Sequence, residues 1–177
     1  MRTLQAGPLT LEPQVAAHAT EMFAVLSDPA IYEYENAPPV SIEALRTRYA
    51  KLESRRSSDG GQQWLNWVMR IDGAGLIGYV QATVYPDNSA SIAYEMASTH
   101  WGRGLGRHAT EAMLRELVDY YGVTRLFAVA KQRNFRSLRL LSRLGFSLAE
   151  PELCAERGVE PDETLMVLAH CRPLARQ

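Results

Sequence analysis

The chain has 177 residues, of which 46% are hydrophobic and 22% are charged, and its formal net charge is -1. This composition is typical of a globular domain and excludes a disordered chain. The near-zero charge gives no overall attraction to nucleic acid or to an anionic membrane. Because a chain of this length supports one substantial core, we expect one domain spanning residues 1–177.

Cysteine content and apolar runs bear on where the protein works. No apolar run reaches the roughly 20 residues that span a bilayer, and residues 1–4 are not followed by the apolar core of a signal peptide. Cys154 and Cys171 are too few for a disulfide scaffold and have no metal-ligand spacing with the four histidines. We therefore expect a cytoplasmic protein with free thiols, no metal, and no membrane or nucleic-acid partner.

The N-terminal third predicts one short strand and two helices. Leucines within 4–11 favour the strand, and apolar residues at helical spacing predict a helix over 14–27. Residues 32–39 read as a loop because they contain two prolines. Ser41 is a candidate N-cap for a second helix over 42–52.

The middle of the chain predicts three antiparallel strands. Residues 64–71 and 76–85 favour strands, and the Asp-Gly-Ala-Gly run between them is a strong hairpin signal. Residues 91–97 supply a third strand. The short connections make these neighbours antiparallel.

The last third alternates helix and strand. We expect helices over 105–120 and 134–144, each stopped by a glycine, and a buried strand over 125–130 between them. Residues 146–148 and 165–168 read as closing strands. The predicted fold is therefore an α/β (α+β) domain with two helices ahead of the hairpins and two behind.

The sharpest local signal is the glycine-rich segment 101–106, Trp-Gly-Arg-Gly-Leu-Gly, between a strand and a helix. Glycines let an anion approach the main chain, and a helix N-terminus offers unpaired N–H groups and the positive end of its dipole. Together they predict a phosphate cradle that needs no metal. Arg103 and Arg107 add positive charge beside it.

Taken alone, this segment fits a glycine-rich turn without a ligand equally well. A P-loop is excluded because the chain has no Gly-x-x-x-x-Gly-Lys-Ser/Thr run. A dinucleotide fingerprint requires Gly-x-Gly-x-x-Gly in an early βαβ unit. Here the spacing is Gly-x-Gly-x-Gly and the segment follows antiparallel strands.

The glycine-rich loop can be interpreted together with a second segment that follows it in the chain. Residues 101–112 and 132–146 resemble the two cofactor segments of the GNAT N-acetyltransferase superfamily. The chain looks like the ribosomal-protein N-terminal acetyltransferase-like branch, which residues 26–31 and 76–79 also fit. The resemblance covers nearly the whole chain. It implies a mixed, mostly antiparallel central sheet flanked by four helices and splayed between the fourth and fifth strands.

The resemblance implies acetyl-CoA as co-substrate. The main chain of Tyr94 to Met96 would pair with the pantetheine arm, amides from Gly102 to Arg107 would hold the pyrophosphate, and Asn134 would hydrogen-bond the pantetheine. The implied cofactor-binding residues are Tyr94, Met96, Trp101, Gly102, Arg103, Gly104, Leu105, Gly106, Arg107 and Asn134.

The chain departs from the family pattern at two positions. Trp101 stands where many members have Arg or Gln, a change that a cradle built of main chain tolerates. Leu141, seven residues after Asn134, stands where many members place a tyrosine as general acid. The tyrosine-acid mechanism therefore does not transfer to this chain.

Two other residues are candidates for catalysis. Glu95, on the strand expected to line the thioester, would take a proton from the amine, directly or through a water. Ser137 would donate a hydrogen bond to the departing thiolate, and an N–H near Met96 would polarise the carbonyl. The alternatives are a strand glutamate paired with an arginine and a first-turn serine that satisfies the backbone.

The predicted activity is transfer of an acetyl group from acetyl-CoA to a primary amine, a protein N-terminus or a small molecule, by direct attack in a ternary complex. Two alternatives stay open: a non-catalytic acyl-CoA-binding sensor or scaffold, and a nucleotide-binding enzyme of another fold. Glu33 and Glu35, between tyrosines in the proline-bounded loop, suit a cationic acceptor. The partner is thus the amine, and a homodimer is a further prediction. Five basic residues are expected on a solvated face: Arg46, Arg48, Lys51, Arg55 and Arg56.

Overall fold

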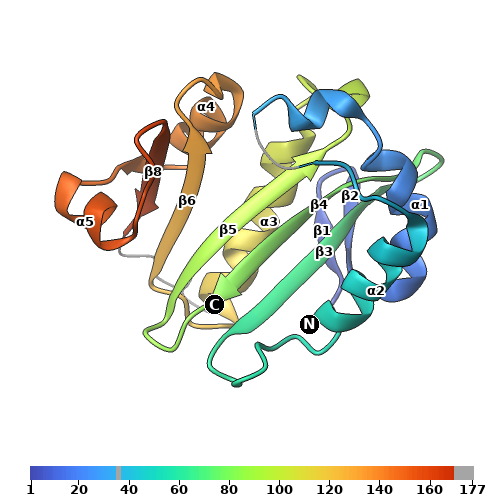
Figure 1. Cartoon of the computed structure of the whole chain (residues 1–177), viewed down its shortest axis with the longest axis horizontal. Helices are drawn as coiled ribbons and strands as arrows, with labels where there is room; N and C mark the ends of the chain where they lie inside the picture. The colour runs from blue at the N-terminus through green and yellow to red at the C-terminus, as the bar shows by residue number, and fades with distance from the viewer. Residues whose placement is uncertain (35–36, 170–177) are drawn as a thin grey trace.

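The computed structural model describes residues 1–34 and 37–169, and its centre is an eight-stranded sheet (Figure 1). The strands are β1 (Leu4–Ala6), β2 (Leu9–Pro13), β3 (Gln63–Ile71), β4 (Gly75–Val84), β5 (Ser89–Met96), β6 (Arg125–Lys131), β7 (Ser147–Leu148) and β8 (Glu163–Leu168). Their order in the sheet is β1-β2-β3-β4-β5-β6-β8-β7. Neighbours are antiparallel except β5 and β6, which are parallel. The predicted mixed, mostly antiparallel sheet is confirmed.

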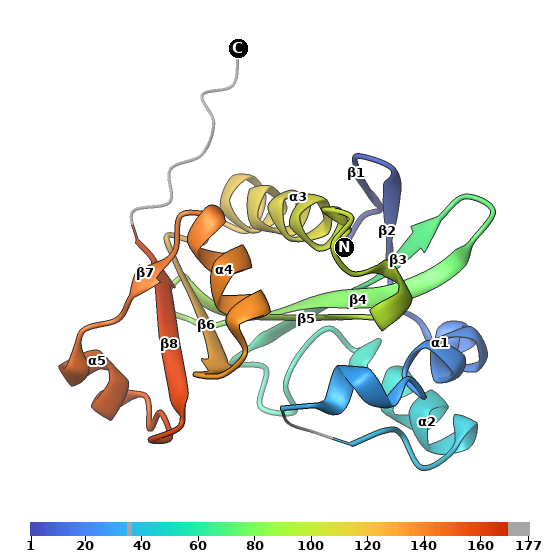
Figure 2. The same ribbon diagram turned by 90° about the horizontal axis from the view of Figure 1, so that it is seen from above.

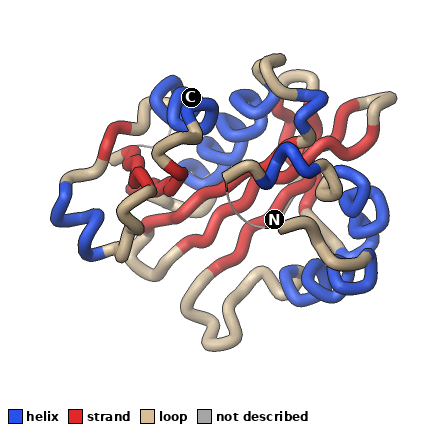
Figure 3. The backbone as a smooth tube through the Cα atoms, turned by 45° about the horizontal axis from the view of Figure 1, so that its top comes forward, coloured by secondary structure: helices blue, strands red, loops and turns tan. Residues whose placement is uncertain are grey.

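Helices cover both faces of this sheet. They are α1 (Ala19–Val25), α2 (Ile42–Leu52), α3 (Leu105–Asp119), α4 (Phe135–Arg143) and α5 (Pro151–Glu156). Figure 2 shows α3 on one face and α1 with α2 on the other, and Figure 3 shows the strands enclosed between these helices. The four predicted helices correspond to α1–α4. The short α5 was not predicted, because six residues carry too little periodicity to be read as a helix.

Two boundaries in the N-terminal third differ from the prediction. The segment 4–11 is a hairpin rather than one strand: Gly7 has a φ of +62°, which reverses the chain so that Leu4 lies opposite Leu11. The helix expected over 14–27 is shorter, because a 3-10 turn, η1 (Ala16–His18), precedes α1. Ser41 caps α2 as expected, since its hydroxyl accepts from the amide of Ala44 at 3.0 Å.

The two faces carry separate apolar cores because strand side chains alternate. On the α3 side, Trp67 and Met69 pack with Met113 and Leu117. On the α1–α2 side, Val68 packs among residues that include Met22, Leu45 and Tyr49. Both cores therefore share β3 and β4, while beyond β5 the sheet has a gap.

That gap is a splay between β5 and β6. The two strands pair only where Ser89–Ser91 meets Arg125–Phe127, and they diverge toward the top of Figure 1. Because β1 and β2 together take the place of the single strand predicted at the N-terminus, this is the splay expected between the fourth and fifth strands. The amide of Ala97 donates to the carbonyl of Ile77 on β4 at 2.9 Å. Main-chain groups alternate in direction along a strand, so those of Tyr94 and Met96 face the opening.

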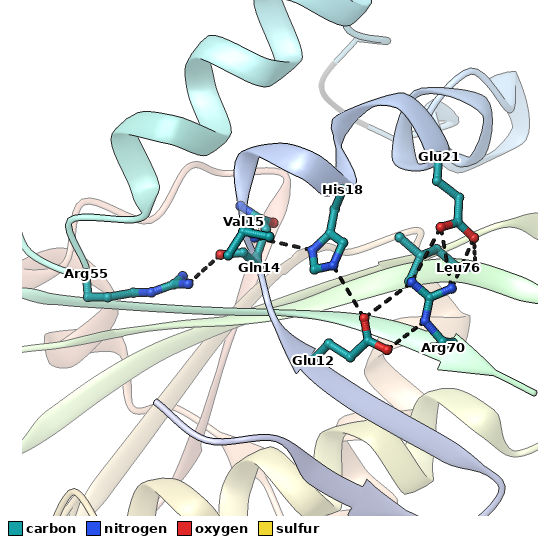
Figure 4. Close-up of polar contacts among 8 residues, drawn as sticks. All are labelled: Glu12, Gln14, Val15, His18, Glu21, Arg55, Arg70 and Leu76. Carbon is teal, nitrogen blue, oxygen red and sulfur yellow. Dashed lines mark hydrogen bonds and ion pairs between the residues drawn. The ribbon is translucent and has the colours of Figure 1, made fainter.

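An ion network fastens α1 to the sheet (Figure 4). Arg70 on β3 bridges Glu12 on β2, at 2.6 Å, and Glu21 on α1, at 3.3 Å. Glu21 also accepts from the amide of Leu76 at 2.6 Å. His18 lies 3.3 Å from Glu12, and burial lowers the pKa of this imidazole. The network holds α1 on the sheet, and the chain leads from the end of α1 to residues that line the site: Leu26, Ala30, Ile31 and Tyr32.

Candidate active site

A cavity of about 810 Å³ opens at the splay. Its loop half is formed by the glycine-rich segment 101–107, by β6 and by α4. Its tyrosine half is formed by η2 (Pro29–Tyr32), α2 and the opposite face of β4 and β5, and takes its name from Tyr32, Tyr34, Tyr49 and Tyr79. All the predicted site residues line this cavity except Arg103, which is exposed.

The glycine segment has the conformation that a phosphate cradle requires. Gly102 and Gly104 both have a φ of +75°, in the left-handed region, and the space beside each Cα is open. Gly104 is the N-cap of α3, and no side chain caps the helix there. The first-turn amides are therefore available to an anion, which the helix dipole also favours.

Trp101 has a structural function in this loop. Its indole Nε1 donates to the carbonyl of Met96 at 2.8 Å, and the guanidinium of Arg136 lies 3.6 Å from the ring centre. The side chain thus ties the loop to β5 and to α4. One lone pair of the Met96 carbonyl is used in this way, while the Met96 amide still faces the opening.

Beside the loop, β5 meets the start of α4. The side-chain oxygen of Asn134 accepts from the amide of Ser137 at 3.1 Å, which makes Asn134 the N-cap. The hydroxyl of Tyr94 lies 2.7 Å from that of Ser137. Burial raises the pKa of Tyr94 to about 12, so the phenol stays protonated. Leu141, at the position where the family tyrosine is absent, is 1% exposed and belongs to the core.

The phenol of Tyr94 is a candidate that sequence reasoning missed. We predicted only a main-chain role for this residue. The strand pattern places its side chain on the α3–α4 side, but only the packing of α4 against β5 brings its hydroxyl to Ser137.

Glu95 lies on the other face of β5, in the tyrosine half. It is opposite Tyr79 on β4, and the two side chains are hydrogen-bonded. Burial, together with the charge of Glu95, raises the pKa of Tyr79 well above its ordinary value. Gly78 makes this geometry possible, because a Cβ there would lie 2.2 Å from the carbonyl oxygen of Glu95.

Two further tyrosines surround the carboxylate. Tyr32 donates to the carbonyl of Leu26 at 2.7 Å, and burial followed by the charge of Glu95 raises its pKa to about 12. The same two causes raise the pKa of Tyr49. The tyrosine half is thus a phenol-rich pocket built around one carboxylate.

The proline-bounded loop contributes only part of what was expected. Tyr32 and Tyr34 line the cavity, but Glu33 is exposed and does not. Glu35 lies outside the described residues. Tyr34 reaches across the opening, where its ring centre is 5.9 Å from the guanidinium of Arg133.

Three polar residues of the tyrosine half were also missed as site residues. Arg48 was expected on a solvated helix face, yet it lines the cavity as well as being exposed. Tyr49 fits the apolar stripe of α2, so its hydroxyl gave no signal. Gln14 follows β2, and its carbonyl accepts from Arg55 (Figure 4).

Residues 8–147 match the family model described as the acetyltransferase (GNAT) domain. The chain therefore belongs to the GNAT family of acetyl-CoA-dependent N-acetyltransferases. No curated protein sequence matches it.

Solved structures share its fold at low identity. The chain is similar to the ribosomal L7/L12 alpha-N-protein acetyltransferase RimL in complex with coenzyme A, with a TM-score of 0.79, 15% identity, and coverage of 96% of this chain and 98% of the other. For the ribosomal-protein-S5-alanine acetyltransferase from Vibrio fischeri, the TM-score is 0.76 and the identity is 16%, with coverage of 98% of this chain and 100% of the other. For a spermidine N-acetyltransferase SpeG chimera from Vibrio cholerae and hSSAT, the TM-score is 0.74 and the identity is 18%, with coverage of 92% of this chain and 96% of the other.

The part of the chain that the structure describes has neither a metal-binding cluster nor a membrane-spanning helix. Residues 1–34 and 37–169 contain no group of three or more His, Cys, Asp or Glu side chains arranged to hold a metal ion. Within the same ranges, every helix is too short or too polar to cross a bilayer.

Proposed function

We propose that the cavity binds acetyl-CoA in its loop half and an amine in its tyrosine half, so that the acetyl group passes directly between them. The observation that carries this proposal is the uncapped N-terminus of α3, which opens into the same cavity as Glu95. An anion site and a candidate base on opposite sides of one splay suit a ternary complex. The acceptor is a primary amine, either of a protein N-terminus or of a small molecule.

The loop half supplies the contacts for acetyl-CoA. Amides of the segment 102–107 would hold the pyrophosphate. The main-chain N–H and C=O of Tyr94 would pair with the pantetheine arm as if it were another strand, which leaves the Met96 amide for the thioester carbonyl. The exposed guanidiniums of Arg103 and Arg107 would add long-range attraction, although Arg107 already bridges Glu111 at 2.7 Å.

The groups that would carry out the transfer step lie on the two faces of β5. Glu95 takes a proton from the amine, whose nitrogen forms a bond to the thioester carbon. The amide of Met96 stabilises the oxyanion. When the carbon–sulfur bond breaks, the paired hydroxyls of Tyr94 and Ser137 supply the hydrogen bond and the proton for the thiolate. This pair replaces the tyrosine that the family pattern places at position 141.

We further infer one domain that works in the cytoplasm without a metal, and without a membrane or nucleic-acid partner. The support is the low cysteine content and the near-zero net charge. A homodimer is the oligomeric state that we propose to test, by light scattering of the purified chain.

The test is release of free CoA from acetyl-CoA across a panel of amines, with mass spectrometry of the acetylated product and calorimetry of acetyl-CoA binding. Amine-dependent release with a matching product supports the enzyme. Tight binding without release for any amine class supports a sensor or scaffold instead. Absence of binding contradicts both functions.

A further inference from the structure

The tyrosine half of the cavity is electrostatically simple. Among the described residues that line it, only Glu95 of β5 and Arg48 of α2 are charged. The other charged lining residues belong to the loop half and are all arginines: Arg107, Arg136, Arg139 and Arg143. The acceptor side therefore has one negative and one positive group, whereas the cofactor side has only positive ones.

The two opposite charges act on the same small region. Each of Tyr32, Tyr49 and Tyr79 has its pKa raised by Glu95 and lowered by Arg48. Glu95, Arg48 and the three tyrosines also all line the cavity, so the two opposite charges border one shared space.

Arg48 lacks a direct side-chain partner within the described part of the chain. Its guanidinium makes no ion pair or hydrogen bond with residues 1–34 or 37–169. Two other arginines of the same basic cluster do have partners: Arg46 donates to Thr20 at 3.3 Å, and Arg55 donates to the carbonyl of Gln14. Of the five residues of the cluster, Arg48 is the one that lines the cavity.

Two buried polar groups in this half also lack a partner. The hydroxyl of Tyr49 and the side-chain amide nitrogen of Gln14 make no hydrogen bond within the described residues, and each residue is only 3% exposed. Both residues line the cavity. A buried polar group without a partner costs about 1–3 kcal/mol, and both groups are donors, so oxygen atoms of a ligand would satisfy them.

We propose that the acceptor is a zwitterion, a small amino acid-like molecule whose amine faces Glu95 and whose carboxylate pairs with Arg48. This inference rests on the proposed function. The guanidinium fork matches a carboxylate in geometry and charge, and Tyr49 and Gln14 supply further donors for its oxygens. Leu26, Ile31 and Pro39 give the remaining walls an apolar character, which suits an aromatic or branched side chain.

Other amines fit this half less well. A polyamine brings a second positive charge toward Arg48 and offers no oxygen to the buried donors. A peptide N-terminus supplies a carbonyl oxygen next to its amine, but no charge to balance the guanidinium. The carboxylate is therefore the feature that separates this acceptor from the alternatives.

The experiment compares acceptors that share one side chain: L-phenylalanine, its primary amide, and phenethylamine, with spermidine and a peptide beginning with phenylalanine as further arms. For the wild-type chain we expect kcat/KM for the free acid to exceed that for every other acceptor by about tenfold or more. Arg48→Gln should reduce the acid-to-amide ratio of kcat/KM to near one, and Arg48→Lys should retain part of it. Arg46→Gln, on the same helix, should leave the ratio unchanged.

The outcomes separate this inference from the proposed function. Equal use of acid and amide, preference for spermidine or the peptide, or an unchanged ratio in Arg48→Gln would overturn the zwitterion. If no acceptor releases CoA, binding of L-phenylalanine to the CoA-saturated protein is measured by calorimetry. Binding that Arg48→Gln abolishes then supports the zwitterion site although the transfer has failed, and absence of binding to the wild-type chain overturns it.

Discussion

The two halves of the cavity are built in different ways. The loop half takes its functional groups from three short segments, the end of β5, the glycine loop and the start of α4, and its main contacts are main-chain amides. The tyrosine half takes side chains from η2, α2, β4 and β5, which are separated by up to dozens of residues. A site for a pyrophosphate can thus be encoded locally, whereas a site for a particular amine depends on which elements the fold brings together.

The largest effect is expected for Glu95, and it tests whether the tyrosine half supplies the catalytic base. Glu95→Gln removes the base but keeps the shape, so we expect kcat to fall by about 100-fold or more. Acetyl-CoA affinity, which depends on the loop half, should stay within about twofold. Steady-state kinetics and calorimetry measure the two quantities. Glu33→Gln, an exposed change nearby, is the control, and an unchanged kcat in Glu95→Gln would remove Glu95 from the mechanism.

The next effect tests whether affinity belongs to the loop half. Gly104→Asp places a carboxylate at the N-cap of α3, where it caps the helix but competes with the pyrophosphate. Gly104→Asn is the matched neutral variant. We expect acetyl-CoA affinity to fall by at least about tenfold in the Asp variant and clearly less in the Asn variant. Equal losses would show that charge at this position does not matter.

A smaller effect is expected for the paired hydroxyls between the halves. Tyr94→Phe and Ser137→Ala should each lower kcat by about tenfold, which corresponds to one charge-assisted hydrogen bond in the transition state. Because the two groups act as a unit, the double variant should lose little more than either single one. Full additivity would mean that the hydroxyls act independently, and no loss would exclude both from protonating the thiolate.

The smallest effect concerns the ion network that fastens α1 to the sheet. The pKa of His18 is lowered by burial in the folded chain, so the folded state disfavours the protonated ring. Its contribution to stability is therefore present above the ordinary histidine pKa, about 6.5, and is lost as the pH falls below it. Glu12, Glu21 and Arg70 face the same ring.

Chemical denaturation at pH 7.5 and pH 5.5 measures this dependence. We expect His18→Gln to lose less stability between the two values than the wild-type chain does. The same loss in both proteins would assign the pH dependence to other groups.

Most of the loop half could be predicted from the sequence. The glycine spacing and the following helix predicted the cradle, and the family resemblance carried by this loop and the later Asn134 segment implied the splay. The contacts of the Trp101 indole with Met96 and Arg136 could not be predicted, because they depend on three elements meeting. Arg103 was included for its charge, although the side chain is exposed and does not line the cavity.

Most of the tyrosine half could not be predicted from the sequence. Glu95 could be chosen from its strand, but Tyr49 and Arg48 looked like the buried and solvated sides of an ordinary amphipathic helix. Gln14 carries no local pattern at all. They come together because α2 packs over β3 and β4, a long-range contact that periodicity does not encode.

Because Trp101 is anchored in the cavity lining, its intrinsic fluorescence can report on ligand binding. Of the three tryptophans, Trp67 is fully buried and Trp64 does not line the cavity, whereas Trp101 lies in the lining itself. Its indole is hydrogen-bonded on one edge and stacked on a cation, so its emission responds to small shifts of the loop. Intrinsic fluorescence of a Trp64→Phe variant would therefore follow occupancy of the loop half in real time, with no label and no turnover.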